Sequence, residues 1–359
     1  VESLASQGAV ALTNKRLVVE LKSLFESFIQ LIATAIDKKS PYTGGHCERV
    51  PEITMLLADA VEKTTEGKYA DFTMTEDERY ELYLAGWLHD CGKVATPPHV
   101  VDKGMKLETI TDRIETVDVR FEVLKRDAEI DMLKKQIDLM KNGTANGEIE
   151  ESENAFKEII EKLTDEQEFI QKTNRGGEFM EEADQKRVSD IGNYRWVSQG
   201  EKINFLDEKE VRNLQIPKGT LLPEEREIIN DHIVITIDML NKLPYPKNLR
   251  KIPEFAGGHH EKLDGTGYPK GLKDDEMSVQ AKMMAIADIY EALTAADRPY
   301  KDGKKLSQAM RIMGFMKKDY EIDEELFAIF VKQGVYKQYA EKYLGEDQLD
   351  EIDEAAVLA

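Results

Sequence analysis

The sequence predicts an all-α protein. Apolar residues recur every three or four positions through most of the chain, which is the spacing of one helix face, whereas few stretches alternate as a half-buried strand does. Residue types that begin helices stand before several of these segments: Thr75 with Glu78, Pro223 and Ser278. We therefore expect a helical bundle with a long N-terminal helix and a helical insertion.

The first predicted element is a long amphipathic helix over residues 15–39. Its apolar residues form a stripe: Leu17, Leu21, Leu24, Phe25, Phe28, Leu31, Ile32 and Ile36. Such a stripe is typical of a packing surface or a dimer seam rather than of a ligand site. We take residues 1–39 as a linker or signalling helix and expect a homodimer through it.

The next well-marked helix begins at a capping box formed by Thr75 and Glu78. It is expected to run into the pair His89–Asp90, and Gly92 is expected to help end it. A histidine and an aspartate at a helix end are well placed to serve as ligands.

We expect residues 107–200 to form an insertion within a larger domain. They are rich in charge and predict two helices, over 107–140 and 155–170, joined around the glycines at 143 and 147. The sequence leaves open whether this region covers the site or recruits a signalling protein partner. The surrounding domain is expected over residues 40–318.

Two further helices carry candidate ligands. Pro223 and the acidic residues after it begin a helix that is expected to carry His232, since acids suit the N-terminal end of the helix dipole. Ser278 is the expected N-cap of a helix over 279–293 that carries Asp288. Residues 319–359 are expected to form an acidic helical C-terminal segment.

Composition excludes several classes of function. The 359 residues carry a formal net charge of −21, which argues against a binder of duplex nucleic acid, and the excess acids gather in segments 141–190 and 319–359. The chain holds no apolar run of the roughly 20 residues that a membrane-spanning helix needs. No signal peptide is visible, and Cys47 and Cys91 make no disulfide framework, so we expect a cytoplasmic protein.

The six histidines stand in unusual contexts. His89 is followed by an aspartate, and His259–His260 is a doublet that precedes a glycine-rich string ending at Pro269. Imidazole and carboxylate sets suit iron, manganese or zinc. Neither zinc-finger spacing nor the HExxH motif is present, so the site is expected to assemble through tertiary packing. His99 alone has the context of a structural or exposed residue.

At these motifs the sequence resembles the HD-GYP phosphodiesterases, a branch of the metal-dependent HD-domain phosphohydrolases. The resemblance covers about residues 30–105 and 220–310. It rests on five pieces in the family's order: 42–50, 89–94, 259–269, 287–294 and 298–300. Residues 1–19 resemble the final helix of a GAF sensor domain, which often precedes this catalytic domain.

The resemblance implies a site with two divalent metal ions, iron or manganese. His46, His89 and Asp288 match the ligands of one metal, and His232, His259 and His260 match those of the second. Asp90 matches the carboxylate that bridges them. Some members bind a third metal through a glutamate four residues before the first histidine, but Tyr42 stands at that position here and predicts that the third metal is absent.

The resemblance also implies residues that act on the substrate. Lys93 matches a lysine near the scissile phosphate, where an ammonium stabilises developing negative charge, and together with Asp90 it is the expected catalytic group. Arg298 is expected to pair with a second phosphate. Gly267, Tyr268 and Pro269 match the loop beside the site and are expected to shape the substrate pocket.

The function implied is hydrolysis of cyclic di-GMP to pGpG, and onward to GMP, by a hydroxide that bridges the metals. Two alternatives stay open. One is cleavage of 3',3'-cyclic GMP-AMP, which some relatives carry out. The other is a signalling domain that binds the nucleotide or a partner protein without turnover, although relatives of that kind tend to lose ligands.

Overall fold

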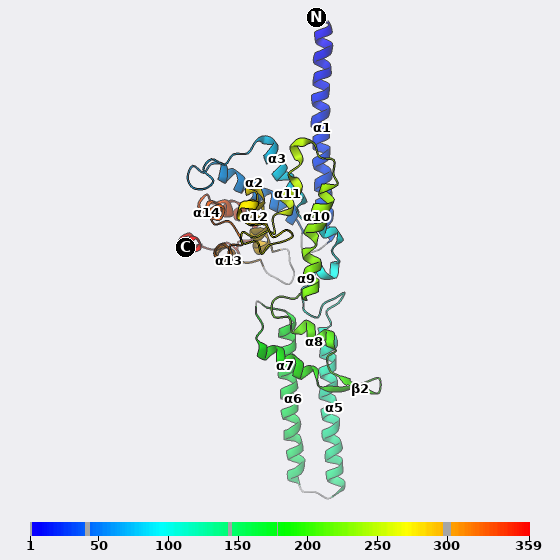
Figure 1. Ribbon diagram of the computed structural model, residues 1–359. Coiled ribbons are helices and arrows are strands. Elements are labelled where there is room, and N and C mark those ends of the chain that lie inside the picture. Colours follow the sequence, from blue (N-terminus) through cyan, green and yellow to red (C-terminus); the bar gives the residue numbers. More distant parts are fainter. Residues whose placement is uncertain (1, 40–43, 143–145, 178, 297–302) are drawn as a thin grey trace. The chain divides into compact units, whose positions relative to one another are not determined.

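The computed structural model describes residues 2–39, 44–142, 146–177, 179–296 and 303–359 (Figure 1). The chain divides into two compact units. Unit 1 comprises Val1–Thr96 and Ile228–Ala359, and unit 2 comprises Pro97–Glu227. Over the described ranges the regular structure is helical apart from one two-stranded sheet, so the predicted all-α class is confirmed. Within those ranges no helix has both the length and the apolar character needed to cross a membrane.

Unit 1 is built from helices that come from both ends of the sequence. Its first part contains α1 (Glu2–Lys39), α2 (His46–Glu62), α3 (Glu76–Leu88) and the 3₁₀ turn η1 (Cys91–Ala95). Its second part contains α10 (His232–Asn241), η2 (Lys247–Leu249), α11 (Ile252–Gly257), η3 (Asp274–Glu276), α12 (Val279–Thr294), α13 (Leu306–Lys318), α14 (Glu324–Lys332), α15 (Val335–Tyr343) and α16 (Glu354–Leu358). The division between the units falls within α9 (Pro223–Asn230).

One hydrophobic core joins the two parts of unit 1. Leu57 of α2 and Leu84 of α3 are fully buried with Tyr290 of α12 and with Phe327 and Phe330 of α14. The acidic C-terminal segment is therefore part of this core, because its apolar residues point inward while most of its acids face solvent. Helices that are distant in sequence are held side by side in this way, and they bring the candidate ligands together.

The apolar residues of α1 lie on two faces of the helix, one buried and one exposed, and do not form the single stripe that we expected. Ile29, Ala33 and Ile36 are buried against the rest of unit 1, and Phe25 packs at the edge of that core. Most of the other expected stripe residues are exposed, with exposed fractions of 56% for Leu17, 67% for Leu21, 54% for Leu24, 55% for Phe28 and 63% for Leu31. The prediction of a single stripe was wrong because residues 25, 29, 33 and 36 follow a different helical row from residues 17, 21, 24, 28 and 31.

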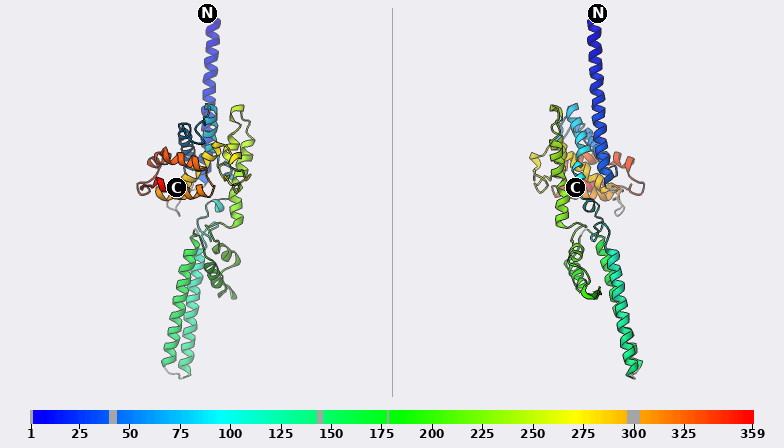
Figure 2. Two further views of the ribbon diagram at one scale, coloured as in Figure 1. Left: turned by 60° about the vertical axis from the view of Figure 1, so that its left-hand side comes forward. Right: turned by 90° about the vertical axis from the view of Figure 1, so that its right-hand side faces the viewer.

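Unit 2 is a smaller helical body. It contains α4 (Pro98–Val101), α5 (Ile114–Lys141), α6 (Asn146–Asn174), α7 (Glu182–Gly192), α8 (Glu208–Leu214) and a hairpin of β1 (Arg195–Ser198) and β2 (Glu201–Asn204). The strands are antiparallel with Arg195 opposite Asn204. Figure 2 shows α5 and α6 lying side by side along their length. We expected the insertion over 107–200, and the compact unit is longer at both ends. Phe205, Leu206 and Leu214 share its core, and Lys106 donates to the carbonyls of Leu214 and Ile216.

Local signals located several helix ends correctly. The Thr75 hydroxyl accepts from the Glu78 N–H, and the Glu78 carboxylate accepts from the Thr75 N–H, which is the expected capping box. Ser278 caps α12 as expected. Two boundaries differ: α3 stops at Leu88, before His89–Asp90, and the helix begun at Pro223 stops at Asn230, so that His232 begins α10 instead.

Candidate metal centre

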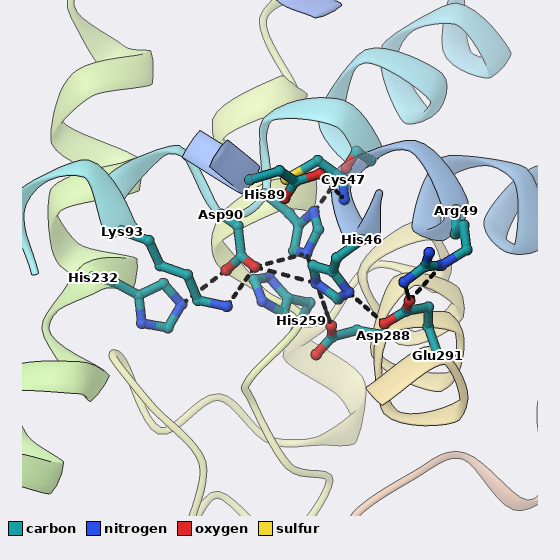
Figure 3. A network of polar contacts seen from close by, with 12 residues as sticks. His46, Cys47, Arg49, His89, Asp90, Lys93, His232, His259, Asp288 and Glu291 are labelled. Carbon is teal, nitrogen blue, oxygen red and sulfur yellow. Dashed lines mark hydrogen bonds and ion pairs between the residues drawn. The ribbon is translucent and has the colours of Figure 1, made fainter. Parts of the chain in front are cut away.

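The seven residues predicted as ligands all lie in unit 1, at or near helix ends with one exception. His46 is the first residue of α2, His89 and Asp90 follow α3, His232 is the first residue of α10, and His259 and His260 follow α11. Asp288 lies in the middle of α12. Packing brings these residues into one cluster, most of which Figure 3 shows.

Close packing at Gly92 brings the two halves of the cluster together. A Cβ at Gly92 would overlap the carbonyl oxygen of His232 and lie 2.7 Å from the Thr236 N. The Gly92 N–H also donates to the Thr236 hydroxyl over 2.8 Å. Since only glycine permits this approach, η1 lies directly against α10 and Asp90 can reach His232.

Asp90 is shared between two groups of donors. Its Oδ2 lies 3.2 Å from His46 Nε2 and 3.4 Å from His89 Nε2. Its Oδ1 lies 3.2 Å from His232 Nε2. The donor atoms of His46, His89 and Asp90 all lie within 4.8 Å of one another, and so do those of His232, His259 and His260. One carboxylate oxygen therefore faces each group, as in a bridging ligand.

Asp288 completes the first group. Its Oδ1 lies 3.3 Å from His46 Nε2 and 3.8 Å from His89 Nε2. The two imidazole nitrogens are themselves 3.2 Å apart. Two histidines and two carboxylates thus converge on one point.

The histidine protonation states follow from the outer hydrogen bonds. His89, His232 and His259 each donate Nδ1–H to the carbonyl three residues earlier, over 2.7, 2.5 and 2.6 Å. Because a carbonyl oxygen can only accept, these Nδ1 atoms carry a proton, and the lone pair of each neutral ring is then on Nε2. His259 Nε2 is buried without a hydrogen-bond partner among the described residues, and His232 Nε2, also buried, faces the Asp90 oxygen. Buried lone pairs aimed at one point are what a metal ion satisfies.

The carboxylates are held in the ionised form. Burial alone would raise the pKa of Asp90, but the neighbouring Lys93 ammonium holds that pKa well below its usual range. Burial likewise opposes ionisation of Asp288, and its interactions with His46 lower its pKa overall. Both groups are therefore anionic near neutral pH and available to a cation.

The doublet His259–His260 is held neutral. Burial, reinforced by neighbouring histidines, lowers the pKa of His259 well below its ordinary value, and burial lowers the pKa of His260 to about 4. Anionic carboxylates and neutral imidazoles together form a donor set that fits a divalent cation such as iron or manganese.

His46 has a different outer partner, which sequence reasoning missed. Its Nδ1 lies 2.5 Å from Glu291 Oε2, and Glu291 in turn accepts from the Arg49 guanidinium over 2.7 Å. Glu291 is only 1% exposed. Burial acts against its ionisation, but His46 and then Arg49 lower the pKa of Glu291 to about 2. Arg49 and Glu291 both fall inside the family motifs, and the spacing Asp288 to Glu291, one helical turn, was the available signal.

Lys93 lies beside the bridging carboxylate. Its Nζ is 2.5 Å from Asp90 Oδ2, and its side chain is 27% exposed. Burial would lower the pKa of Lys93, but attraction to Asp90 and Asp288 raises it, so the group stays an ammonium. A cation at the edge of the cluster, open to solvent on one side, is available to an anionic ligand.

The loop after the doublet is built on a buried carboxylate. Glu261 accepts from the N–H groups of Lys270 and Leu272 over 2.7 and 2.8 Å. A Cβ at Gly267 would overlap the Lys262 backbone, so the loop closes only with glycine there. Tyr268 stacks on His260 with ring centroids 4.8 Å apart, and its bond to Pro269 is cis. The loop therefore covers a ligand of the second group.

Two predicted residues are not placed. Arg298 and Tyr42 lie outside the described residues. His99, expected to have no part in the site, belongs to unit 2.

Comparison with known proteins gives one family match. Residues 209–326 match a family described as the HD domain, a range that includes His232, His259, His260 and Asp288. His46, His89 and Asp90 precede the matched range, and most of unit 2 separates them from it.

Curated relatives are similar over parts of the chain. A 3'3'-cGAMP-specific phosphodiesterase of Vibrio cholerae is 36% identical over 138 residues, which is 38% of this chain and 29% of the relative. A cyclic di-GMP phosphodiesterase of Thermotoga maritima is 41% identical over 93 residues, or 26% of this chain and 25% of the relative. One of Pseudomonas aeruginosa is 44% identical over 79 residues, or 22% of this chain and 18% of the relative. The chain spans less than a third of the length of these relatives. The HD-domain match and these similarities support an HD-domain phosphohydrolase of the HD-GYP type, the family that the sequence motifs resemble.

Proposed function

We propose that this chain is a metal-dependent phosphodiesterase that hydrolyses cyclic di-GMP to the linear dinucleotide pGpG, and onward to GMP. The observation that carries the proposal is Asp90, whose two oxygens face two separate groups of histidine nitrogens (Figure 3). Such an arrangement suits two adjacent cations. The similarity to phosphodiesterases acting on cyclic dinucleotides supports the same reaction class.

His46, His89, Asp90 and Asp288 would hold one divalent ion, and His232, His259, His260 and Asp90 the other. Ions bound there supply Lewis-acid chemistry: they neutralise phosphoryl oxygens and make nearby water more acidic. We propose iron or manganese, since histidine with carboxylate suits both. Two ions account for all seven ligands.

Lys93 is the residue that we propose to act on the substrate beside the metal ions. Its ammonium lies against Asp90 and is partly open to solvent, so a phosphate oxygen that approaches the cluster can reach it. A fixed positive charge at that position stabilises the negative charge that develops on a phosphoryl oxygen during attack. We assign Gly267, Tyr268 and Pro269 to the loop that shapes the site beside His260, on which Tyr268 stacks. We assign Arg298 to the second phosphate of the substrate.

A second substrate has a specific observation in its favour. One of the relatives is named as specific for 3'3'-cGAMP, and it shares 36% identity over 138 residues. We therefore propose 3',3'-cyclic GMP-AMP as the alternative substrate. Both molecules present the same phosphodiester groups to the metals, and they differ in one base.

The test is turnover by protein loaded anaerobically with Fe²⁺ or Mn²⁺. Cyclic di-GMP and 3',3'-cyclic GMP-AMP are supplied separately, and linear products are separated by chromatography. We expect a linear dinucleotide from the loaded wild type and none from Asp90→Ala. Glu254→Gln is the matched control, because Glu254 is an exposed acid on α11, the helix before His259.

The rival hypothesis is a domain that binds the nucleotide without turnover. Loaded protein that binds cyclic di-GMP and 3',3'-cyclic GMP-AMP but releases no linear product would favour this hypothesis and refute the enzyme. Elemental analysis of the same sample establishes whether the metals were present. Both buried cysteines are free, which suits the reducing cytoplasm in which we place this reaction.

We also propose a parallel homodimer through α1. The exposed residues Leu17, Leu21, Leu24, Phe28 and Leu31 are separated alternately by four and three positions, which is the seam of a coiled coil. Continuing this heptad pattern toward the N-terminus places Asn14 at heptad position a. A single asparagine at that position specifies the register of a two-stranded coiled coil. A second copy of α1 is the partner that would cover these residues and pair the asparagines.

Sedimentation tests the dimer. We expect the wild type to sediment as a dimer and the double variant Leu21→Glu, Leu24→Glu as a monomer. Ser23→Glu adds the same kind of charge at an exposed position off the seam and should leave the dimer intact. A monomeric wild type, with and without residues 1–30, would remove the basis of this proposal.

A further inference from the structure

The last turn of α1 contacts the start of α2, where His46 lies. Asp37 Oδ2 accepts from the N–H of Gly45 over 3.1 Å and from the N–H of Cys47 over 3.2 Å. The N-cap residue of α2 is Gly45, which has no side chain to perform this role. Asp37 is 7% exposed. A carboxylate from another helix therefore caps the N-terminus of α2, where free N–H groups and the helix dipole favour negative charge.

The same turn also contacts the segment that carries Asp90 and Lys93. Lys39 Nζ donates to the backbone carbonyls of Lys93, Val94 and Thr96 over 3.1, 2.5 and 2.7 Å. An ammonium has three protons, and all three are used. These carbonyls lie at the C-terminal end of η1, and the C-terminal end of a helix favours positive charge.

Two residues of α1 thus hold two segments that lie far apart in the sequence, one at Gly45 and Cys47 and the other at 93–96. The helix itself is anchored by Ile29, Ala33 and Ile36, which are buried in the unit 1 core. Movement of this last turn would shift the start of α2 and the end of η1 together. His46 lies between the two residues whose N–H groups Asp37 holds, and Lys93 supplies one of the carbonyls.

We propose that Asp37 and Lys39 are positioning residues that make the geometry of the metal centre depend on the last turn of α1. This inference rests on the metal centre of the proposed function and not on its substrate. It assigns the long N-terminal helix a regulatory role: a change in the helix reaches the site through the hydrogen bonds of these two side chains.

The test compares Lys39→Met with Lys38→Met in the full chain. Methionine keeps most of the length of lysine and removes all three donors, while Lys38 is the exposed neighbour on the same turn. The readouts are the Kd for Mn²⁺ and the visible absorption spectrum of the Co²⁺-loaded protein, which reports ligand geometry. We expect Lys39→Met to raise the Kd about tenfold and to change the Co²⁺ spectrum, by analogy with loss of other outer contacts of metal ligands. Lys38→Met should match the wild type.

Conservative variants separate positioning from folding. Lys39→Arg restores a cation with several donors and should recover most of the affinity and the wild-type Co²⁺ spectrum. Asp37→Asn keeps one acceptor oxygen and should give a smaller change than Asp37→Ala. Circular dichroism establishes that each variant is folded before metal is added.

The outcomes are distinguishable from those of the enzyme assay. If Lys39→Met and Asp37→Ala both bind Mn²⁺ with the wild-type Kd and keep the wild-type Co²⁺ spectrum, the positioning role is refuted. If the wild type binds metal without hydrolysing either dinucleotide, the phosphodiesterase proposal fails, while the metal-binding comparison still decides the role of Asp37 and Lys39.

Discussion

Replacing Glu291 by glutamine removes one buried negative charge and leaves the shape of the side chain almost unchanged. Glu291 lies 2.5 Å from His46 Nδ1 and is 1% exposed, so solvent does not screen the interaction. The carboxylate makes His46 a more basic ligand and fixes its ring, and a glutamine at this position could still accept the Nδ1 proton through its carbonyl oxygen. The expected loss is therefore in ligand strength more than in orientation.

The magnitude follows from the behaviour of outer partners of metal ligands. Their loss typically costs about 10- to 100-fold in metal affinity, or about 1.4 to 2.8 kcal/mol. We expect Glu291→Gln to weaken Mn²⁺ binding about tenfold, because one hydrogen bond survives. Glu291→Ala should weaken it about 100-fold, because both that bond and the Arg49 contact are lost.

The assay measures Mn²⁺ binding through the electron paramagnetic resonance signal of the free ion. Glu254→Gln serves as the control again, since it removes an exposed charge from α11. Wild-type affinity in Glu291→Ala would show that the carboxylate does not support His46 as a ligand, and the reasoning would then be refuted.

Three further predictions concern packing and pH. Gly92→Ala forces η1 away from the His232 carbonyl, so we expect unit 1 to lose about 1 to 3 kcal/mol in denaturant unfolding and Mn²⁺ affinity to fall; an unchanged midpoint would contradict the contact. Gly267→Ala meets the Lys262 backbone and should weaken substrate binding more than Mn²⁺ binding, so equal losses in both titrations would count against its role in the loop. Burial lowers the pKa of Lys106 from 10.5 to about 8. Between pH 8 and pH 10.5 the unfolded chain therefore binds more protons than the folded chain, so the unfolding free energy of unit 2 should rise with pH over this range. We expect a rise of about 3 kcal/mol relative to Lys106→Met. Parallel pH profiles for the two proteins would exclude that assignment.

Much of the fold was predictable because its signals are local. The capping box at Thr75 and the Ser278 cap depend on residues three positions apart, and the periodicity of apolar residues reports the helix directly. The break between α9 and α10 was not predictable in the same way. Residues 230 and 231 carry no proline or glycine, and the His232 imidazole donates to the Ile229 carbonyl, an oxygen that a continuous helix would pair with a backbone N–H.

The candidate site was likewise predictable only in part. Residue types and motif order were sufficient to select His46, His89, Asp90, His232 and the other proposed ligands. Glu291 and Asp37 were missed because their partners lie on other helices. Glu291 is 245 residues from His46, and Asp37 is 10 residues from Cys47, and neither contact follows from a local residue pattern.

By itself the sequence determined the helical class, the chemical identity of the proposed ligands and the resemblance to HD-GYP proteins, since these depend on residue type and short spacing. Only the tertiary structure decided which nitrogens face the centre, that Asp90 divides its oxygens between two groups, and that α1 has one buried and one exposed apolar face. The physical reason is that hydrogen bonds and close packing between distant helices depend on atomic positions set by the whole core. A local pattern carries no information about which distant backbone atom will lie within hydrogen-bonding distance.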